Sequence, residues 1–200
     1  MLNLQFDENS AKKANEGGKG LGKVLDSGVY DVELQTVSVT TASTGTIGLD
    51  FSFKVDGAQY PNTVYGMWIQ KANGDKLFSY DIVQALMGLL GITKTTTYQK
   101  EIEVKDGTKI VEAIKEFDNR KVKIAIQKVL DCYNGEVKEK NEIKGFMDYE
   151  TGQTYTEKVA NKEATQIEYY KKLKDKETPE YKACMMDKED ESEEPSGSLL

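Results

Sequence analysis

The clearest alternation of hydrophobic and polar residues runs through the stretch IGLDFSFKV, from Ile47 to Val55. Every second residue of this stretch is apolar: Ile47, Leu49, Phe51, Phe53 and Val55. The residues between them are small, polar or charged: Gly48, Asp50, Ser52 and Lys54. Because successive side chains of a β-strand point to opposite faces, the pattern predicts a strand with one buried and one solvent-facing side.

Two further strands are predicted on either side of this one in the chain. The stretch GVYDVELQTVSVTT, which begins at Gly28, alternates up to Leu34 and resumes at Val37 in the opposite phase, which indicates a β-bulge. Asp56-Gly57 is a tight-turn signal, and a third strand follows it over about Gln59–Gln70. The residues of that strand fall into two parity groups: Tyr65, Met67 and Ile69 in one, and Val64, Gly66, Trp68 and Gln70 in the other.

Helical spacing of apolar residues follows the third strand. A helix is predicted from an N-cap at Ser79 to about Leu90, with Gly91 as its stop. A second, short helix is predicted over Thr108–Phe117, whereas Thr95–Val104 fits neither a helix nor a strand clearly.

The second half of the chain begins with a predicted β-hairpin. The stretch Arg120–Tyr133 is rich in β-branched residues and changes phase near Lys128. Asn134-Gly135 is the strongest hairpin turn in the chain, and Glu136–Met147 is the predicted partner strand. A helix over about Asn161–Lys176 is the last regular element expected.

This element order predicts a mainly β protein: a five-stranded OB-fold-like barrel with a helix between strands three and four, an inserted short helix, a C-terminal helix and a disordered acidic tail. The phase changes in the first and fourth strands suit a small barrel, because its strands must curl to close. Other small β-barrels and β-sandwiches stay open as alternatives. Four segments are expected: a flexible, polar and glycine-rich arm (1–27), the OB-fold domain (28–147), a C-terminal helical extension (148–182) and a disordered acidic tail (183–200).

Charge is distributed unevenly along the chain, whose formal net charge is −7. The segment Asp187–Glu194 has six acidic residues and one basic residue, and a like-charge block of this kind cannot form a core. The segment Asn119–Met147 has seven basic and four acidic residues, which is a net charge of +3. An acidic chain with a basic patch is compatible with nucleic-acid binding, because the local potential governs the contact.

Composition disfavours several classes of function. The chain has no histidine, which removes Ser-His and Cys-His nucleophile pairs and histidine metal sites. It has no run of about 18 apolar residues and no apolar leader, so we expect neither a membrane association nor secretion. Cys132 and Cys184 form no disulfide framework or zinc pattern, which favours a reducing cytoplasm. We therefore expect no enzyme activity, no cofactor and no metal site, although a nuclease that holds its metal with carboxylates alone stays formally open.

A glycine-rich motif near the N-terminus has one alternative interpretation. The stretch from Gly17 to Lys23 has the spacing G-x-x-x-x-G-K of a phosphate-binding loop. Val24 stands where such a loop needs Ser or Thr, and a polar segment precedes it where a strand is needed. A flexible, weakly basic arm is the better interpretation.

Trp68 is the main candidate for contact with nucleic acid. If Met67 and Ile69 face the core, the only tryptophan of the chain faces outward. Exposed aromatic rings stack on unpaired bases for about 1–3 kcal/mol per base, and lysines neutralise phosphates. The alternative is a reversed parity, with Trp68 packed under the helix or the arm. The candidate nucleic-acid-binding residues are Trp68, Lys54, Ser52, Gln70, Lys71, Tyr133 and Lys138.

Two stretches carry a resemblance to a known family: SGVYDVELQTVSVTTASTGTIGLDFSFKVDG and MWIQKANGDKLFSYDIVQALMGLLGI. They resemble the single-stranded-DNA-binding proteins of tailed bacteriophages, over roughly residues 27–147 and in the character of the tail. The resemblance implies an OB-fold that binds single-stranded DNA without sequence specificity, in the outer groove of the barrel. It also implies that the acidic tail contacts phage or host replication proteins, such as polymerase, helicase–primase or recombination enzymes, in the cytoplasm of the infected host cell. The tail residues concerned are Asp187, Glu189, Asp190, Glu191, Glu193 and Glu194.

The end of the chain departs from that family pattern. Such tails commonly finish with an aromatic residue that docks in a partner, whereas here Leu199-Leu200 follow Pro195 and three small residues. The leucines could replace the aromatic residue, or the acidic residues alone could be the functional element.

The expected function is a non-sequence-specific single-stranded-DNA-binding protein of phage replication and recombination, which protects the strand and recruits replication proteins through its tail. When DNA is absent, the polyanionic tail is expected to occupy the lysines that otherwise bind DNA. The alternative is an OB-fold protein-interaction module whose acidic tail mimics DNA toward a host or phage enzyme. The oligomeric state, including a homodimer, and the preference for DNA or RNA are left open.

Overall fold

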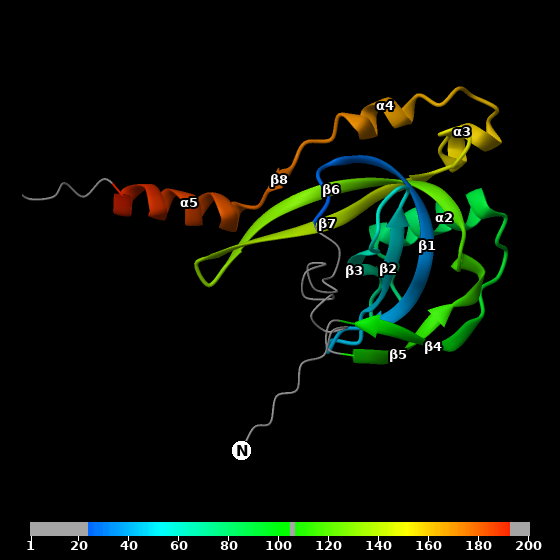
Figure 1. Ribbon diagram of the computed structural model, residues 1–200, viewed down its shortest axis with the longest axis horizontal. Helices are drawn as coiled ribbons and strands as arrows, with labels where there is room; N and C mark the ends of the chain where they lie inside the picture. The colour runs from blue at the N-terminus through cyan, green and yellow to red at the C-terminus, as the bar shows by residue number, and fades with distance from the viewer. Residues whose placement is uncertain (1–23, 105–106, 193–200) are drawn as a thin grey trace, which may run out of the picture. The chain divides into compact units, whose positions relative to one another are not determined.

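The computed structural model of the protein describes the backbone of residues 24–104 and 107–192 and the side chains of residues 24–104 and 107–186 (Figure 1). These residues divide into two compact units. Unit 1 comprises residues 31–122, and unit 2 comprises residues 24–30 and 123–192. In the part of the chain that is described, none of the helices combines the length and the apolar character that a membrane span requires.

Unit 1 is built on an antiparallel sheet with the strand order β3-β2-β1-β5-β4. Its strands are β1 (Gly28–Thr41), whose first residues belong to unit 2, β2 (Ile47–Val55), β3 (Asn62–Gln70), β4 (Thr97–Val104) and β5 (Gly107–Ile114). Among the described strands, β3 and β4 are the two ends of this order and do not pair with each other. The prediction of a mainly β protein is therefore confirmed, but the sheet is open, and the predicted closed five-stranded barrel is not found.

The short helix predicted at Thr108–Phe117 is wrong. These residues form most of β5 and one 3-10 turn, η1 (Lys115–Phe117). β5 pairs with β4 along its whole length, from Thr97 opposite Ile114 to Val104 opposite Gly107. The β-branched residues of this stretch suit a strand at least as well as a helix, so the presence of a partner strand decides the outcome.

The core of unit 1 is formed by one face of the sheet and the apolar face of α2 (Phe78–Leu90), which packs against β3 (Figure 1). The bulge predicted in β1 is present between Leu34 and Thr36, so that both Leu34 and Val37 are buried. The opposite face of β1, β2 and β3 carries small, polar and aromatic side chains. The largest buried side chains of unit 1 are Leu34, Val37, Phe51, Phe53, Leu86 and Phe117.

Gly91 ends α2, as its sequence position predicts. It has a left-handed φ of 68°, and the N–H of the next residue, Ile92, donates a hydrogen bond to Met87 O over 2.8 Å. The predicted N-cap is wrong, because Leu77 holds the cap position and Ser79 lies inside the helix.

The predicted hairpin of the second half is confirmed as β6 (Lys121–Tyr133) and β7 (Glu136–Met147). The turn residues Asn134 and Gly135 have φ values of 53° and 76°, which is the left-handed backbone that an Asn-Gly hairpin turn requires. The phase change predicted near Lys128 lies a little earlier, where the register shifts between Ala125 and Ile126.

Residues just before β1 are bound to this hairpin, although they were expected to belong to the flexible arm. Leu25 N–H donates to Asn141 Oδ1 over 2.9 Å, and Asn141 Nδ2 donates back to Leu25 O over 2.8 Å. Lys128 N–H donates to the Ser27 hydroxyl over 3.0 Å. The remainder of the predicted arm, with the glycine-rich motif at 17–23, lies outside the described residues.

The C-terminal extension consists of α3 (Tyr155–Val159), α4 (Gln166–Lys171), β8 (Lys176–Glu177) and α5 (Pro179–Ser192). The helix predicted over Asn161–Lys176 is therefore present only as the short α4. The backbone of residues 183–192, expected to be part of a disordered tail, continues α5, because Ala, Met, Lys and Glu are good helix formers. Residues 193–200 lie outside the described part of the chain.

Glu157 is a buried carboxylate, 8% exposed, that joins α3 to the start of α4. Its Oε2 accepts hydrogen bonds from the backbone N–H and the hydroxyl of Thr154, both over 2.9 Å. Its Oε1 accepts from the backbone N–H and the hydroxyl of Thr165 and from Gln166 N–H, over 2.8–2.9 Å. Burial disfavours the charged form, but these hydrogen bonds outweigh burial and lower the pKa of Glu157 to about 2.

Within unit 2, the ionised carboxylate of Glu157 links α3 to the start of α4. We expect Glu157→Gln, which keeps the shape but removes the charge, to lower the free energy of unfolding at pH 7 by about 2–4 kcal/mol in chemical denaturation. Because the pKa of this carboxyl is depressed in the folded state, its contribution is present above the ordinary value of 4.5 and is lost as the pH falls toward 2. The difference between the two proteins should therefore shrink at about pH 3. The matched control is Glu163→Gln, at an exposed position between the same helices, which should leave stability at pH 7 unchanged.

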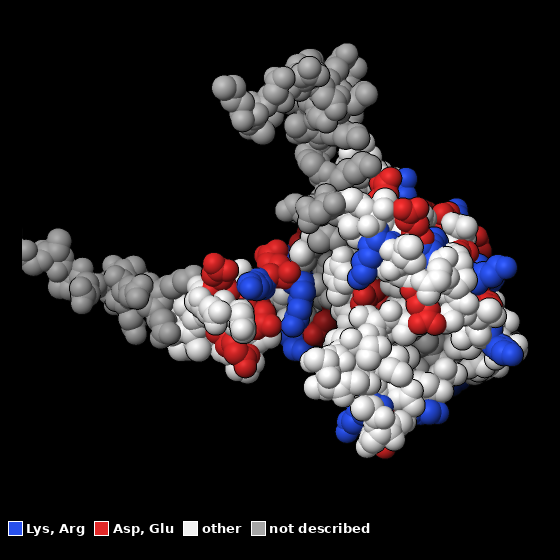
Figure 2. Space-filling view, turned by 90° about the horizontal axis from the view of Figure 1, so that it is seen from below, with Lys and Arg blue, Asp and Glu red and all other residues white. Residues whose placement is uncertain are grey.

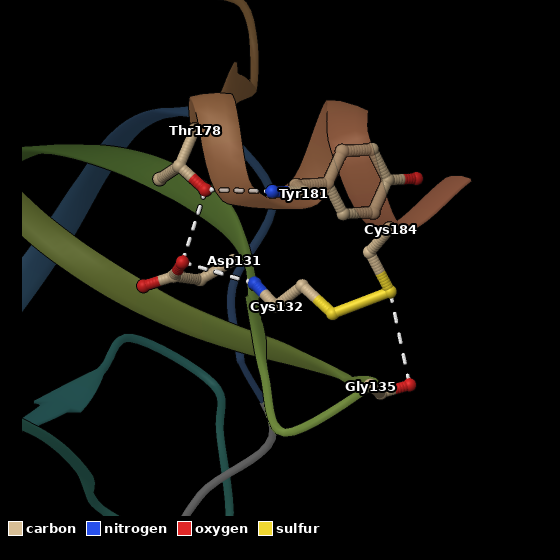
Figure 3. Close-up of a disulfide and its surroundings, with 6 residues drawn as sticks. All are labelled: Asp131, Cys132, Gly135, Thr178, Tyr181 and Cys184. Atoms are coloured by element: carbon tan, nitrogen blue, oxygen red, sulfur yellow. Dashed lines mark hydrogen bonds between the residues drawn. A yellow bond between two sulfur atoms is a disulfide. The ribbon is translucent and has the colours of Figure 1, made fainter. Parts of the chain in front are cut away.

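A disulfide between Cys132 and Cys184 joins α5 to the end of β6 (Figure 3). The expectation that these cysteines form no disulfide is wrong, because a separation of 52 residues carries no pairing signal, whereas the fold brings their Cα atoms to 6.3 Å. β8 runs parallel to β6 and leads the chain there. The Thr178 hydroxyl donates to Asp131 Oδ1 over 2.9 Å and accepts from Tyr181 N–H over 3.1 Å, which anchors the first turn of α5.

Reduction of this bond is expected to melt α5. None of the described side chains of Pro179–Met186 is buried, and an isolated helix of this length is marginal in water. In Cys184→Ser, the backbone N–H groups of α5 should exchange with solvent at rates close to those of an unstructured chain, as measured by hydrogen exchange. Wild-type protein treated with a dithiol should behave in the same way, and unchanged protection of α5 in both samples would contradict the prediction.

Candidate nucleic-acid interface

Trp68 faces outward on β3, as predicted from its position next to the buried Met67. Gly66 has a left-handed φ of 65°, and the pairing of β2 with β3 shifts register beside it, between Leu49 and Phe51. The alternation of β3 therefore changes phase at Gly66: Val64 and Met67 are buried, whereas Tyr65 is 58% exposed and Trp68 38% exposed. The predicted parity, which grouped Tyr65 with Met67, is wrong for Tyr65 and correct for Trp68.

The indole of Trp68 lies against the backbone of two glycines. A Cβ atom built on Gly48, its cross-strand neighbour in β2, would lie 2.7 Å from Cε3 of the ring. A Cβ atom built on Gly66 would lie 3.1 Å from Cζ2. Both positions therefore need glycine for the ring to rest where it does. A ring supported in this way by the sheet is a fixed apolar platform on a polar face.

Phe78 is a second exposed aromatic residue near the same end of β3, and it is 78% exposed. The chain before α2 pairs with β3: Gln70 bridges Lys76, and Leu77 N–H donates to Ile69 O over 2.9 Å. Phe78 directly follows as the first residue of α2 and so lies near this end of β3. Sequence reasoning missed Phe78, because it has the same helical spacing as the apolar residues of α2 and so reads as part of the core.

The cations around this aromatic surface are few. Lys54 and Lys71 are exposed, but Lys54 lies directly across the strand pair from Glu33. Lys54 is also six residues along β2 from Gly48, the partner of Trp68, which is a distance of roughly 20 Å. Lys76 Nζ lies 4.1 Å from the centre of the Tyr80 ring, a cation–π contact. Gln70, predicted to bind nucleic acid, donates its side-chain amide to Gly74 O over 3.0 Å and so orders the loop after β3.

Tyr133 and Lys138, the remaining predicted residues, belong to unit 2. Tyr133 is 64% exposed, and Lys138 Nζ lies 5.0 Å from the centre of its ring. Three lysines of the predicted basic patch form ion pairs within the β6–β7 hairpin: Lys128–Glu139 at 3.0 Å, Lys140–Asp131 at 3.3 Å and Lys144–Glu142 at 3.8 Å. These pairs engage the three amines but leave the net charge of +3 unchanged, because the acidic residues are already counted in it.

Two members of these ion pairs, Asp131 and Lys128, have shifted pKa values. The hydrogen bond from Thr178 and then the one from Lys140 lower the pKa of Asp131. The hydrogen bond to Glu139 raises the pKa of Lys128.

On the face of the molecule shown in Figure 2, basic and acidic side chains are interspersed, with broad uncharged areas between them. Attraction between this surface and a phosphate backbone is therefore moderate.

A cavity of about 350 Å³ lies in unit 1 between the polar face of β1–β3 and the hairpin of β4 and β5. Ser52, a predicted site residue, lines it together with Tyr65. Burial, and to a lesser extent the charge of Asp50, raises the pKa of the Tyr65 hydroxyl, although a hydrogen bond with Thr63 acts in the opposite direction. The described residues that line it are Thr36, Ser38, Asp50, Ser52, Tyr60, Pro61, Thr63, Tyr65, Ile102, Glu103, Val104, Lys109 and Val111.

The β4–β5 hairpin is fixed to the rest of unit 1 by a small polar network. Lys100 Nζ donates to Gln35 O of β1 over 2.7 Å and to Asp118 Oδ1 over 3.0 Å. The Tyr98 hydroxyl donates to the same carboxylate, and this hydrogen bond raises the pKa of Tyr98. The cavity thus has one wall from the sheet and one wall from a hairpin anchored to it.

The predicted tail residues are described only in part. Asp187, Glu189, Asp190 and Glu191 belong to the helical backbone of α5, and Glu193 and Glu194 lie outside the described residues. Where side chains are described, no group of three or more Cys, Asp or Glu residues is placed to hold a metal ion.

The glycine support of Trp68 can be tested by adding one methyl group. In Gly48→Ala the new Cβ would overlap the indole, so the ring should move away from the sheet. We expect a red-shifted tryptophan emission and stronger quenching by acrylamide. Gly28→Ala is the matched control on β1, because its new Cβ would lie 3.9 Å from the nearest side chain, and it should leave the spectrum unchanged. An unshifted spectrum in Gly48→Ala would contradict the proposed packing.

No protein-family model, curated protein or solved structure matches the chain.

Proposed function

We propose that the protein binds single-stranded DNA without sequence specificity and carries out no catalysis. The observation that supports this most strongly is the indole of Trp68, 38% exposed and supported by Gly48 and Gly66. An unpaired base offers a flat face of any sequence to such a ring, whereas the bases of a duplex are already stacked on one another. The nearby Phe78 extends the aromatic surface for a neighbouring base.

Phosphates are bound by exposed amines. In unit 1 the candidates are Lys71, which directly follows β3, and Lys54, which lies near the opposite end of β2 from the partner of Trp68. In unit 2, Lys138 and Tyr133 form a second pair of a cation and an exposed ring, which suits a nucleotide equally well. With so few cations, stacking supplies a large share of the affinity.

The element order supports an OB-fold-like origin for this arrangement. Three consecutive strands, a helix and a final hairpin occur in the order of an OB-fold, and β4 and β5 are an insertion between the helix and the hairpin. The strands of such folds bind oligonucleotides on one face. In this proposal the inserted hairpin forms the outer wall of the binding surface.

The acidic segment has two roles in the proposal. It competes with DNA for the lysines when no DNA is bound, and it recruits replication or recombination proteins when DNA has displaced it. The motivation is the block of six acidic residues among the eight residues from Asp187 to Glu194.

A protein-interaction module is the second candidate function. Among the described strands, β4 pairs only with β5, so its other edge can accept a further strand. A partner bound there would engage the backbone of β4 and not the ring of Trp68.

Replacement of Trp68 separates the two functions. We expect Trp68→Ala to weaken binding of a dT oligonucleotide about 5- to 150-fold, which corresponds to the loss of one stacked base, as measured by fluorescence anisotropy. Tyr155→Ala is the matched control, because Tyr155 is also 38% exposed but lies in α3. Because two or three lysines contact phosphates, the logarithm of the affinity should fall with the logarithm of salt concentration with a slope of only about −1 to −2.

The same titration with residues 1–186 tests the tail. Tighter binding of this shorter chain at low salt supports competition by the acidic segment, and equal binding discards that role but keeps the DNA function. If wild-type protein does not bind the oligonucleotide at low salt, the DNA function is wrong and the interaction module is favoured.

A further inference from the structure

The cavity between the sheet and the β4–β5 hairpin has a serine hydroxyl on its wall. Ser38 is 7% exposed and lines the cavity. The neighbouring Thr36 hydroxyl donates to Gln35 O over 2.7 Å. Among the described residues, no fully buried side-chain nitrogen or oxygen lacks a hydrogen-bond partner, so the Ser38 hydroxyl reaches the open space of the cavity, where it can donate to or accept from a ligand.

The walls of the cavity suit a flat and partly polar ligand. The sheet side contributes the rings of Tyr60 and Tyr65 and several hydroxyl groups, and the hairpin side contributes aliphatic side chains such as Val104 and Val111. A volume of about 350 Å³ is near the lower limit for small-molecule sites. The cavity can therefore enclose a single base, with or without its sugar, but not several nucleotides.

Charge decides which part of a nucleotide enters. Among the residues that the structure describes, the cavity is lined by two carboxylates, Asp50 and Glu103, and by one amine, Lys109. Asp50 Oδ1 accepts a hydrogen bond from Gly66 N–H over 2.7 Å, which fixes this carboxylate beside the platform of Trp68. Two negative charges against one positive charge disfavour a phosphate group, so the phosphates stay outside and the base points inward.

The same carboxylates select among bases. A carboxylate is a strong acceptor with room for several donors, and its usual partner on a base is an exocyclic amino group, such as N4 of cytosine. Cytosine, adenine and guanine carry such a group, whereas thymine presents a carbonyl oxygen in its place. The one donor of the thymine edge, N3–H, lies between two carbonyl oxygens, so a carboxylate that accepts from it also meets an oxygen that it repels.

The cavity is adjacent to the stacking platform along one strand. Tyr65 lines the cavity, and Trp68 follows three residues later on β3, which is a distance of roughly 10 Å along a strand. Both side chains are exposed on the same face. One strand of DNA can therefore reach both places with bases close together in its sequence.

From these observations we propose that the cavity captures one base of the bound strand by its edge and prefers bases with an exocyclic amino group to thymine. The inference rests on the proposed binding of single-stranded DNA. It adds a limited base preference to a surface that otherwise accepts any sequence.

The experiment compares dC and dT oligonucleotides of equal length at one salt concentration, by fluorescence anisotropy with the full chain. We expect dC to bind about tenfold more tightly than dT. In Glu103→Leu the ratio should fall toward one, mainly because dC loses affinity. Glu101→Leu is the matched control, because it lies exposed two residues earlier on the same side of β4 but does not line the cavity, and it should keep the ratio of the wild type.

Ser38→Ala provides a second, independent variant. It removes only the hydroxyl on the cavity wall and should lower the dC/dT ratio while leaving the affinity for dT within about twofold. Equal affinities of wild-type protein for the two oligonucleotides, or tighter binding of dT, would overturn the inference and leave the proposed DNA function intact as long as Trp68→Ala still weakens binding. Absence of binding to either oligonucleotide would overturn both.

Discussion

The hydrogen bond from Gly66 N–H to Asp50 Oδ1 is the contact on which the functional face of unit 1 depends. It holds a left-handed residue in the middle of a strand, where only glycine adopts that backbone without strain. The change of phase at this point lets β3 place Val64 and Met67 in the core and still turn both Tyr65 and Trp68 outward. A regular strand could bring only one of these two aromatic residues to the surface, because they are three positions apart.

Local patterns predicted the parts of the fold that depend on neighbours in sequence. The strand Ile47–Val55, the Asn134-Gly135 turn and the stop of α2 at Gly91 all follow from period-two alternation or from a backbone conformation that few residues adopt. The stretch Thr108–Phe117 could not be resolved in this way, because its apolar spacing fits a helix and its β-branched residues fit a strand. Its partner, β4, decided the outcome, and that partner was itself ambiguous.

The candidate site was predictable to a similar extent. Trp68 stands out because it is the only tryptophan, and it faces outward as expected. Phe78 could not be found, since its helical spacing indicates burial and only the position of α2 on the sheet leaves it exposed. The cavity and the Cys132–Cys184 bond arise from segments distant in sequence, which periodicity cannot relate. The net charge of +3 in Asn119–Met147 was a correct count, and the ion pairs of the β6–β7 hairpin leave it unchanged, because their acidic members are already in that count.

The bond between Cys132 and Cys184 makes a covalent ring of the chain between them, which includes the hairpin turn, β7, α3 and α4. Such a ring acts mainly on the unfolded protein, because it removes conformations that an open chain of the same length would explore. For a separation of 52 residues, the loss of loop entropy in the unfolded state corresponds to about 4 kcal/mol of stabilisation. The helices α3 and α4 are too short to be stable on their own. They gain stability because the disulfide removes unfolded conformations of the segment that contains them. The described part of the acidic segment, Asp187–Ser192, belongs to α5 beyond Cys184 and therefore lies outside this covalent ring.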